Sequence, residues 1–192
     1  MGAPRARIVF VVAAAAALAA AAAFFVRPAC LSFRDRDGRP AGLFLLNRDG
    51  EFELSHRHSV AKLPWIDEFR VGPGGVMVLF RTRYGAFGAG LPSGDEGGMV
   101  SLDDGWIVID GMHREFQSVA LSVSSITGHR LAVGSRAWAL WPVVAGRTPV
   151  TMAVERLPAG LVAAWFIGHA GLLRRAAAGA GPEPAVRTTE GD

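Results

Sequence analysis

The hydrophobic pattern changes twice along the chain, and its first part is an uninterrupted apolar run from Ile8 to Val26. As a helix this run is about 28 Å long, close to the thickness of the hydrocarbon core of a bilayer. Arg5 and Arg7 precede it, so the positive-inside rule places the N-terminus in the cytoplasm and the following chain on the extracytoplasmic (periplasmic) side of the cell membrane. A cleaved signal peptide is the alternative, but the run is long for a signal-peptide core and Arg27-Pro28-Ala29 is a poor cleavage context. We therefore expect residues 1–29 to form a cytoplasmic stub and an uncleaved signal anchor.

The second part, residues 30–156, consists of short apolar runs separated by turn signals such as Asp37-Gly38 and Asp49-Gly50. Pairs of this kind between apolar runs are typical of tight turns between strands. Frequent turns without an amphipathic helix predict an all-β fold, an antiparallel β-sandwich of nine to eleven strands, jelly-roll-like or a partly open barrel. The expected strands are 31–34, 43–46, 52–59, 65–71, 76–84, 99–102, 106–109, 118–123, 129–133, 136–140 and 150–154.

The expected strand 52–59 alternates, with Phe52, Leu54, His56 and His58 on one face. Residues 65–71 read as its hairpin partner. A hairpin centred near Lys62 pairs position 56 with position 68, and a shift of the centre by one residue brings position 58 opposite position 68. In both registers we expect the Glu68 carboxylate to reach an imidazole.

The third part begins with Leu157–Leu173, which carries no charge and ends at Arg174-Arg175. It predicts an apolar helix over 157–175. Small residues at 160, 164 and 168 would let the N-terminal helix approach, which favours a second membrane span, whereas His169 and Trp165 oppose it. The alternative is a helix that lies on the membrane or packs on the domain. We expect the Ala-, Gly- and Pro-rich segment 176–192 to be disordered.

The charge distribution argues against a nucleic-acid-binding protein, and the cysteine content argues against a disulfide-stabilised or cysteine-metal protein. The net charge is +3 and the pI is near 9.9, but the basic residues are scattered arginines and Lys62 is the only lysine, so we expect no nucleic-acid partner. Because Cys30 is the only cysteine, an intrachain disulfide and a cysteine metal cluster are excluded.

The strongest candidate chemistry lies at the predicted hairpin. His56 and His58 would point to one face, a spacing that metal sites use, and Glu68 would complete a three-ligand set. The interpretation we favour is a buried His58 satisfied by Glu68 or by a backbone carbonyl, with His56 partly exposed, and the metal set is the alternative. Ser59 is adjacent to His58, yet neighbouring strand residues face opposite ways, so these two do not form a nucleophile–base pair.

Further candidates are Trp65 and the glycine loop of Gly88 and Gly90. Backbone amides of a glycine-rich turn can bind an anion, although such a loop also serves simply to end a strand. Asp67 and Glu68 point apart on a strand and are not a general acid–base pair. We find no catalytic constellation and therefore expect neither an enzyme nor a cofactor.

Several motifs together resemble an uncharacterised bacterial domain-of-unknown-function family (family 1850). They are His58-Ser59-Val60, Pro64-Trp65, Glu68-Phe69, Gly88-Ala89-Gly90 with Pro92, Arg147 to Thr151, and Val154-Glu155-Arg156. The resemblance covers roughly residues 30–156. The family pattern has no histidine at the place of His56, which weakens the two-histidine metal hypothesis. Members of this family have an N-terminal membrane segment and are often found beside TRAP-type solute transporters of the TAXI branch. The resemblance thus implies an accessory role, by association only.

Two functional hypotheses follow. The first is a membrane-anchored extracytoplasmic accessory domain, held in lipid by its N-terminal helix, that partners the membrane subunit of a TRAP/TAXI transporter or its solute-binding protein. Its binding or interface candidates are His58, Ser59, Trp65, Glu68, Gly88 and Gly90. The alternative is a small-ligand- or metal-binding β-module that uses His58, Glu68 and the Gly88–Gly90 loop.

Overall fold

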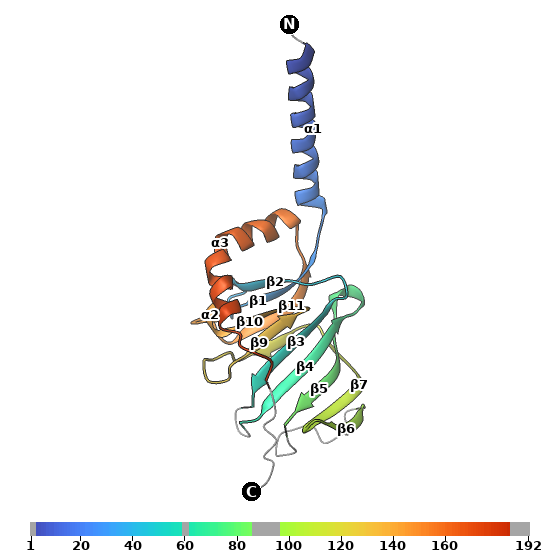
Figure 1. The fold of residues 1–192 in the computed structure, drawn as a ribbon, viewed down its shortest axis with the longest axis vertical. Coiled ribbons are helices and arrows are strands. Elements are labelled where there is room, and N and C mark those ends of the chain that lie inside the picture. The colour runs from blue at the N-terminus through green and yellow to red at the C-terminus, as the bar shows by residue number, and fades with distance from the viewer. Residues whose placement is uncertain (1–2, 59–61, 86–96, 185–192) are drawn as a thin grey trace.

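The computed structural model describes residues 3–58, 62–85 and 97–184, and Figure 1 shows two antiparallel sheets joined to a long N-terminal helix. One sheet has four strands in the order β2-β1-β11-β8, and the other has seven in the order β10-β9-β3-β4-β5-β7-β6. The predicted all-β sandwich class is confirmed, and the described strands form two sheets rather than a closed barrel.

The strands are β1 Ala29–Arg34, β2 Pro40–Leu45, β3 Glu51–Arg57, β4 Pro64–Val71, β5 Met77–Tyr84, β6 Met99–Asp103, β7 Trp106–Phe116, β8 Val119–Leu121, β9 Arg130–Val133, β10 Arg136–Ala139 and β11 Val150–Arg156. The helices are α1 Ala3–Phe25, α2 Trp141–Val144 and α3 Ala159–Ala178, with one 3-10 turn, η1, at Pro73–Gly75.

The hydrophobic core lies between the two sheets. Alternation along β3 buries Phe52 and Leu54, and alternation along β1 buries Leu31 and Phe33. Phe33 packs edge-on against Phe44 of the neighbouring strand, with ring centroids 5.5 Å apart. Burying each of these large side chains contributes about 1.5–3 kcal/mol, so the alternating pattern is what holds the sheets face to face.

The β3–β4 hairpin forms, but in a different register from the predicted one. His56 lies opposite Trp65, and Glu53, rather than a histidine, lies opposite Glu68. The turn closes early because the His58 amide donates to the Leu63 carbonyl, 2.9 Å, and the Lys62 amide donates to the His58 carbonyl, 2.9 Å. The predicted pairing of Glu68 with position 56 or 58 was therefore wrong.

The N-terminal helix α1 stands away from the sandwich (Figure 1). Within the described residues, Arg7–Phe25 is the one helical segment long and apolar enough to cross a membrane, and none of it is buried. Only Val26–Pro28 separate α1 from β1, which is the second strand of the four-stranded sheet.

Helix α3 starts beside the end of α1. The Ala159 amide donates to the Val26 carbonyl, 2.8 Å, and a Cβ added at Gly160 would lie 3.3 Å from the Ala23 Cβ. No atom would lie within 4 Å of a Cβ at Gly168, so the stripe of small residues does not follow α1. The helix packs on the sandwich instead, through its buried residues Val162, Leu173 and Ala176.

The described part of the C-terminal segment is ordered, whereas we expected disorder from residue 176 onward. Helix α3 continues to Ala178, and the chain then runs back along the β-domain (Figure 1). There Glu183 binds Arg83 of β5, 2.9 Å between carboxylate and guanidinium. Residues 185–192 lie outside the described residues.

Candidate functional site

An imidazole–indole cluster occupies the ends of the strands of the larger sheet. It consists of His56, His58, Trp65, Tyr84 and His129. The ring centroids of His56 lie 5.8 Å from Trp65 and 5.1 Å from His129. Trp65 is in turn 5.7 Å from His58 and 5.8 Å from Tyr84.

The strand register builds this cluster. Trp65 lies opposite His56 on one side and opposite Tyr84 on the other, so alternation places all three side chains on one face of the sheet. That face is the one that carries Phe52 and Leu54 into the core. The cluster therefore continues the core face to the edge of the sandwich, where polar rings replace aliphatic side chains.

Two imidazoles of the cluster are kept neutral. Burial lowers the pKa of His56 to about 4, with a smaller contribution from His58. Burial likewise lowers the pKa of His129 to about 4, with a contribution from His56. His129 Nδ1 shares a hydrogen bond with the Thr127 hydroxyl, 2.8 Å, whereas His56 Nδ1 is buried with no hydrogen-bond partner among the described residues. A neutral ring with an unpaired nitrogen is suited to hydrogen-bond a ligand rather than to carry charge.

Asp67 fixes the orientation of the tryptophan. Its Oδ1 accepts a hydrogen bond from the Trp65 indole N–H, 2.7 Å, and another from the Thr82 hydroxyl, 2.7 Å. Glu68 points to the other face, where it binds Arg81 and Arg83. The prediction that Asp67 and Glu68 point apart is thus confirmed, and the pair is not a general acid–base couple.

The opposite face of the larger sheet carries a charged network of Glu53, Glu68, Arg81, Arg83, Asp110 and Arg130. Glu53 binds Arg130 and Arg83, both at 3.2 Å. Glu68 binds Arg83 at 2.9 Å and Arg81 at 3.3 Å, and Arg81 also binds Asp110 at 3.0 Å. Each acid therefore meets a guanidinium on a neighbouring strand.

Burial governs the titration of Glu53 in this network. It raises the pKa of Glu53 above its ordinary value, and Glu183 adds to the rise, while Arg83 and Arg130 oppose it. At the exposed end, the hydrogen bond from Arg81 lowers the pKa of Asp110. The network is a set of ion pairs, so it is better suited to hold five strands (β3, β4, β5, β7 and β9) and the C-terminal segment together than to do proton chemistry.

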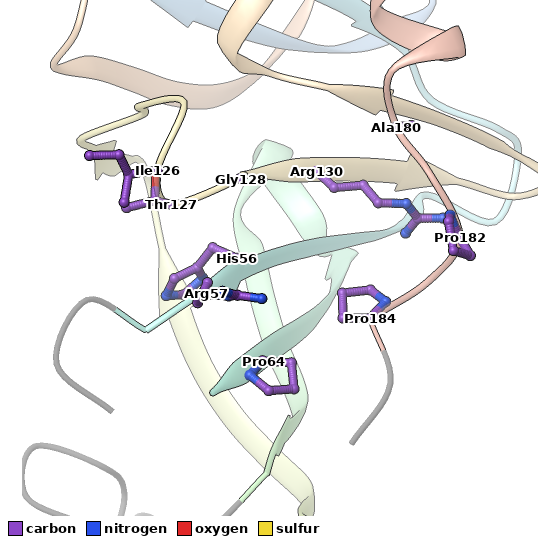
Figure 2. Close-up of a pocket in the computed structure, with 10 residues that line it drawn as sticks. All are labelled: His56, Arg57, Pro64, Ile126, Thr127, Gly128, Arg130, Ala180, Pro182 and Pro184. Atoms are coloured by element: carbon purple, nitrogen blue, oxygen red, sulfur yellow. The ribbon is translucent and has the colours of Figure 1, made fainter. Parts of the chain in front are cut away.

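A pocket of about 420 Å³ lies between the imidazole–indole cluster and the C-terminal segment (Figure 2). In Figure 2 the 126–128 loop borders it on one side and the chain from Ala180 to Pro184 on the other. The Arg57 amide donates to the Thr127 carbonyl, 2.8 Å, which ties that loop to the end of β3. The lining residues are His56, Arg57, Pro64, Ile126, Thr127, Gly128, Arg130, Ala180, Pro182 and Pro184. An imidazole and two guanidinium groups among prolines form a wall suited to a small ligand with hydrogen-bond acceptors.

The alternative metal set of His56, His58 and Glu68 does not assemble. Glu68 lies on the face opposite His56 and His58, and in the described part of the chain no three His, Cys, Asp or Glu side chains come close enough together to hold a metal ion.

The sequence-predicted candidates divide into three groups. His58 and Trp65 come together in the cluster, and Glu68 belongs to the charged network. Ser59, Gly88 and Gly90 lie outside the described residues. Sequence reasoning missed His129, Thr127 and Tyr84 as members of the site. The Thr127-Gly128 turn signal marked where the next strand begins, but the pairing of β9 with β3 brings His129 to His56, and no local pattern encodes that pairing.

Comparison with known proteins identifies one family. No curated protein and no solved structure matches the chain. Residues 52–140 match the model of a family described as a domain of unknown function, a shorter segment than the resemblance of roughly 30–156. The matched segment spans the seven-stranded sheet from β3 to β10, including the cluster and the charged network. This match covers a little under half of the chain, and it shows that the central segment is similar to the family described as Domain of unknown function (DUF1850).

Proposed function

We propose that this protein is a membrane-anchored accessory domain whose β-sandwich contacts a partner at the membrane surface. The observation that carries the proposal is the junction between α1 and the sandwich. Three residues connect α1 to β1, and the hydrogen bond from Ala159 to Val26 ties the start of α3 to the same point.

This junction limits the reach of the domain. Three extended residues span at most about 11 Å, and the second connection through α3 removes part of that freedom. With α1 inserted in a bilayer, the sandwich therefore stays against the membrane and meets partners that are embedded in it or bound to its surface.

The class and the location of the partner rest on the sequence. The arginines at positions 5 and 7 favour a cytoplasmic N-terminus and a β-domain on the periplasmic side. The family resemblance favours a TRAP/TAXI-type transporter subunit or its solute-binding protein. Binding residues are expected among His58, Ser59, Trp65, Glu68, Gly88 and Gly90.

Co-purification tests this proposal. The tagged full-length chain is solubilised from its native membrane in mild detergent, and the recovered proteins are identified and quantified by mass spectrometry. We expect a transporter subunit or a solute-binding protein in near-stoichiometric amount. The control replaces α1 with an unrelated membrane span and should retain the partner if the sandwich binds it. Recovery of the chain alone would contradict the accessory role.

A second candidate function is supported by the pocket beside His56. The unpaired His56 Nδ1 and the pocket of about 420 Å³ suit a small-ligand-binding module. Native mass spectrometry of the full-length chain should then show a bound molecule of defined mass. The adduct should be lost in His56→Ala and kept in His113→Ala, because His113 is an exposed histidine on β7. A chain of the bare protein mass in every preparation would count against this module.

A further inference from the structure

The first half of α3 presents an apolar face to solvent. Leu161 is 62% exposed and Ile167 is 79% exposed. Ala164, Gly168 and Gly171 are also exposed, and no charged side chain occurs before Arg174. The opposite side of the helix is occupied, because Val162 is buried against Cys30 and Leu43 of the four-stranded sheet. An exposed apolar stripe on a helix that is already packed on its domain calls for a second contact.

The position of α3 indicates what covers this stripe. Figure 1 shows α3 beginning at the foot of α1, with its first part across the end of the domain from which α1 leaves and its last part lower down, beside α2. Gly160 lies against Ala23, which is two residues, or about 3 Å of helix rise, from the end of α1 at Phe25. The first turn of α3 is therefore level with the end of the candidate membrane span.

We propose that the first half of α3 lies in the interface of the lipid bilayer, with Leu161, Ala164 and Ile167 inserted among the acyl chains. The inference rests on α1 being a membrane anchor and adds a second, lateral lipid contact. The occupant is lipid rather than a protein partner because the stripe is continuous with the lipid-facing helix through the Gly160–Ala23 contact.

The charges around the stripe agree with this assignment. Arg27 and Arg156 are exposed at the foot of α1, and Arg174 and Arg175 are exposed where the stripe ends. The guanidinium groups of Arg27 and Arg156 would lie at the level of the lipid phosphates, where cations are favourable near anionic lipids. Arg174 and Arg175 belong to the half of α3 that packs against α2 and β10.

A pocket beneath the stripe provides a further apolar contact. It measures about 300 Å³ and opens between α3 and the four-stranded sheet, with Phe33, Leu43, Leu157, Leu161 and Trp165 in its wall. The Trp165 Nε1 is buried with no hydrogen-bond partner in the described part of the chain. Interfacial tryptophans direct the N–H towards polar groups, so this enclosed indole, which stacks on His169 with ring centroids 3.8 Å apart, supports the helix from the pocket side and is not itself part of the lipid contact.

Depth-dependent fluorescence quenching tests the proposal on the full-length chain in liposomes. Single cysteines are introduced as Leu161→Cys and Ile167→Cys and labelled with the environment-sensitive dye NBD; native Cys30 is buried and stays unlabelled. Ile126→Cys is the matched control, since Ile126 is also 79% exposed but lines the pocket beside His56 and Arg57. Leu18→Cys in α1 reports whether the anchor is inserted.

Lipids with a nitroxide near the ester group or near the end of the acyl chain serve as quenchers. We expect the shallow quencher to reduce NBD emission at 161 and 167 to a similar extent, and neither quencher to affect the label at 126. If the label at 18 responds to the deep quencher while the labels at 161 and 167 respond to neither quencher, the lipid contact of α3 is overturned. The anchoring of α1 in the bilayer would still stand in that case. Stronger quenching at 167 by the deep quencher than by the shallow one would also overturn it, because α3 would then enter the bilayer as a span.

Discussion

Neutral buried imidazoles make the stability of this protein depend on pH. In the folded state the pKa values of His56 and His129 are lowered to about 4 by burial, whereas an unfolded histidine titrates near 6.5. Between these values the unfolded chain binds protons that the folded chain does not, so the free energy of unfolding falls as the pH drops from about 6.5 towards 4. Above about pH 6.5 this contribution is fully present.

A histidine variant separates this effect from carboxylate titration. His129→Asn should reduce the slope of unfolding free energy against pH between about 6.5 and 4, although it also removes a ring contact. His113→Asn, which changes an exposed histidine, should leave the slope as it is in the parent protein. Denaturant unfolding at a series of pH values measures both. Equal slopes in the parent and His129→Asn proteins would mean that His129 is not kept neutral by burial.

Thr82 is a second residue whose contribution to the free energy of unfolding can be measured. It is almost fully buried and donates to the Asp67 carboxylate, 2.7 Å, next to the Trp65 indole. Thr82→Val keeps the shape of the side chain but leaves a carboxylate lone pair unsatisfied, so we expect a loss of about 1–3 kcal/mol in the free energy of unfolding. Thr151→Val, at an exposed strand position, should change it by less than about 0.5 kcal/mol. Two equal effects would show that the bond to Asp67 contributes little.

Among the elements, β6 depends on a glycine that precedes it. A Cβ at Gly98 would lie 2.7 Å from the Ile109 Cγ2 and 2.8 Å from the Asp110 carbonyl oxygen on β7. Because backbone cannot move aside as a side chain can, Gly98→Ala should displace β6 from β7 and raise the amide exchange rates of residues 99–103. Gly171→Ala, where a Cβ meets nothing within 4 Å, should leave those rates unchanged. Unaltered exchange in Gly98→Ala would show that β6 absorbs the extra methyl group.

The elements were more predictable than their pairing. Apolar runs and the flanking glycines Gly72 and Gly134 located β4 and β10 to within about a residue, because both signals are local. The length of β7 was underestimated, since its second half carries exposed polar residues such as His113 and Glu115. The hairpin register was wrong because Lys62 adopts a left-handed conformation (φ 58°) in the turn, and nothing in its residue type indicates this.

The candidate site was predictable only in part for the same reason. His58 and Trp65 were found because they belong to one hairpin. His129 joins them through the long-range pairing of β9 with β3. Glu68 is not part of the cluster, because in the observed register it lies opposite Glu53 and points to the other face of the sheet, where it binds Arg83. Strand order and register are properties of the whole sheet, so a reading of separate segments does not supply them.

For the whole molecule, the junction of α1 and α3 sets how the sandwich is oriented relative to α1. Gly160 allows the two helices to approach, with Ala23 3.3 Å from an added Cβ. Gly160→Leu should push them apart, break the hydrogen bond from Ala159 to Val26 and speed exchange of the Ala159 amide. Gly168→Leu adds the same side chain to the same helix where nothing lies within 4 Å, so it should not affect that amide. Equal exchange in both variants would show that the junction does not depend on Gly160.

The pairing of the first strand with the last one has a consequence for biosynthesis. β1 pairs with β11 from Ala29–Arg156 to Arg34–Thr151, whereas the seven-stranded sheet needs only residues 51–139. As the chain leaves the ribosome, the larger sheet is complete while the β1–β2 pair still lacks β11, which is made later. Closure of the four-stranded sheet is then the late, long-range step, and an interrupted chain would leave β1 and β2 open to mispairing.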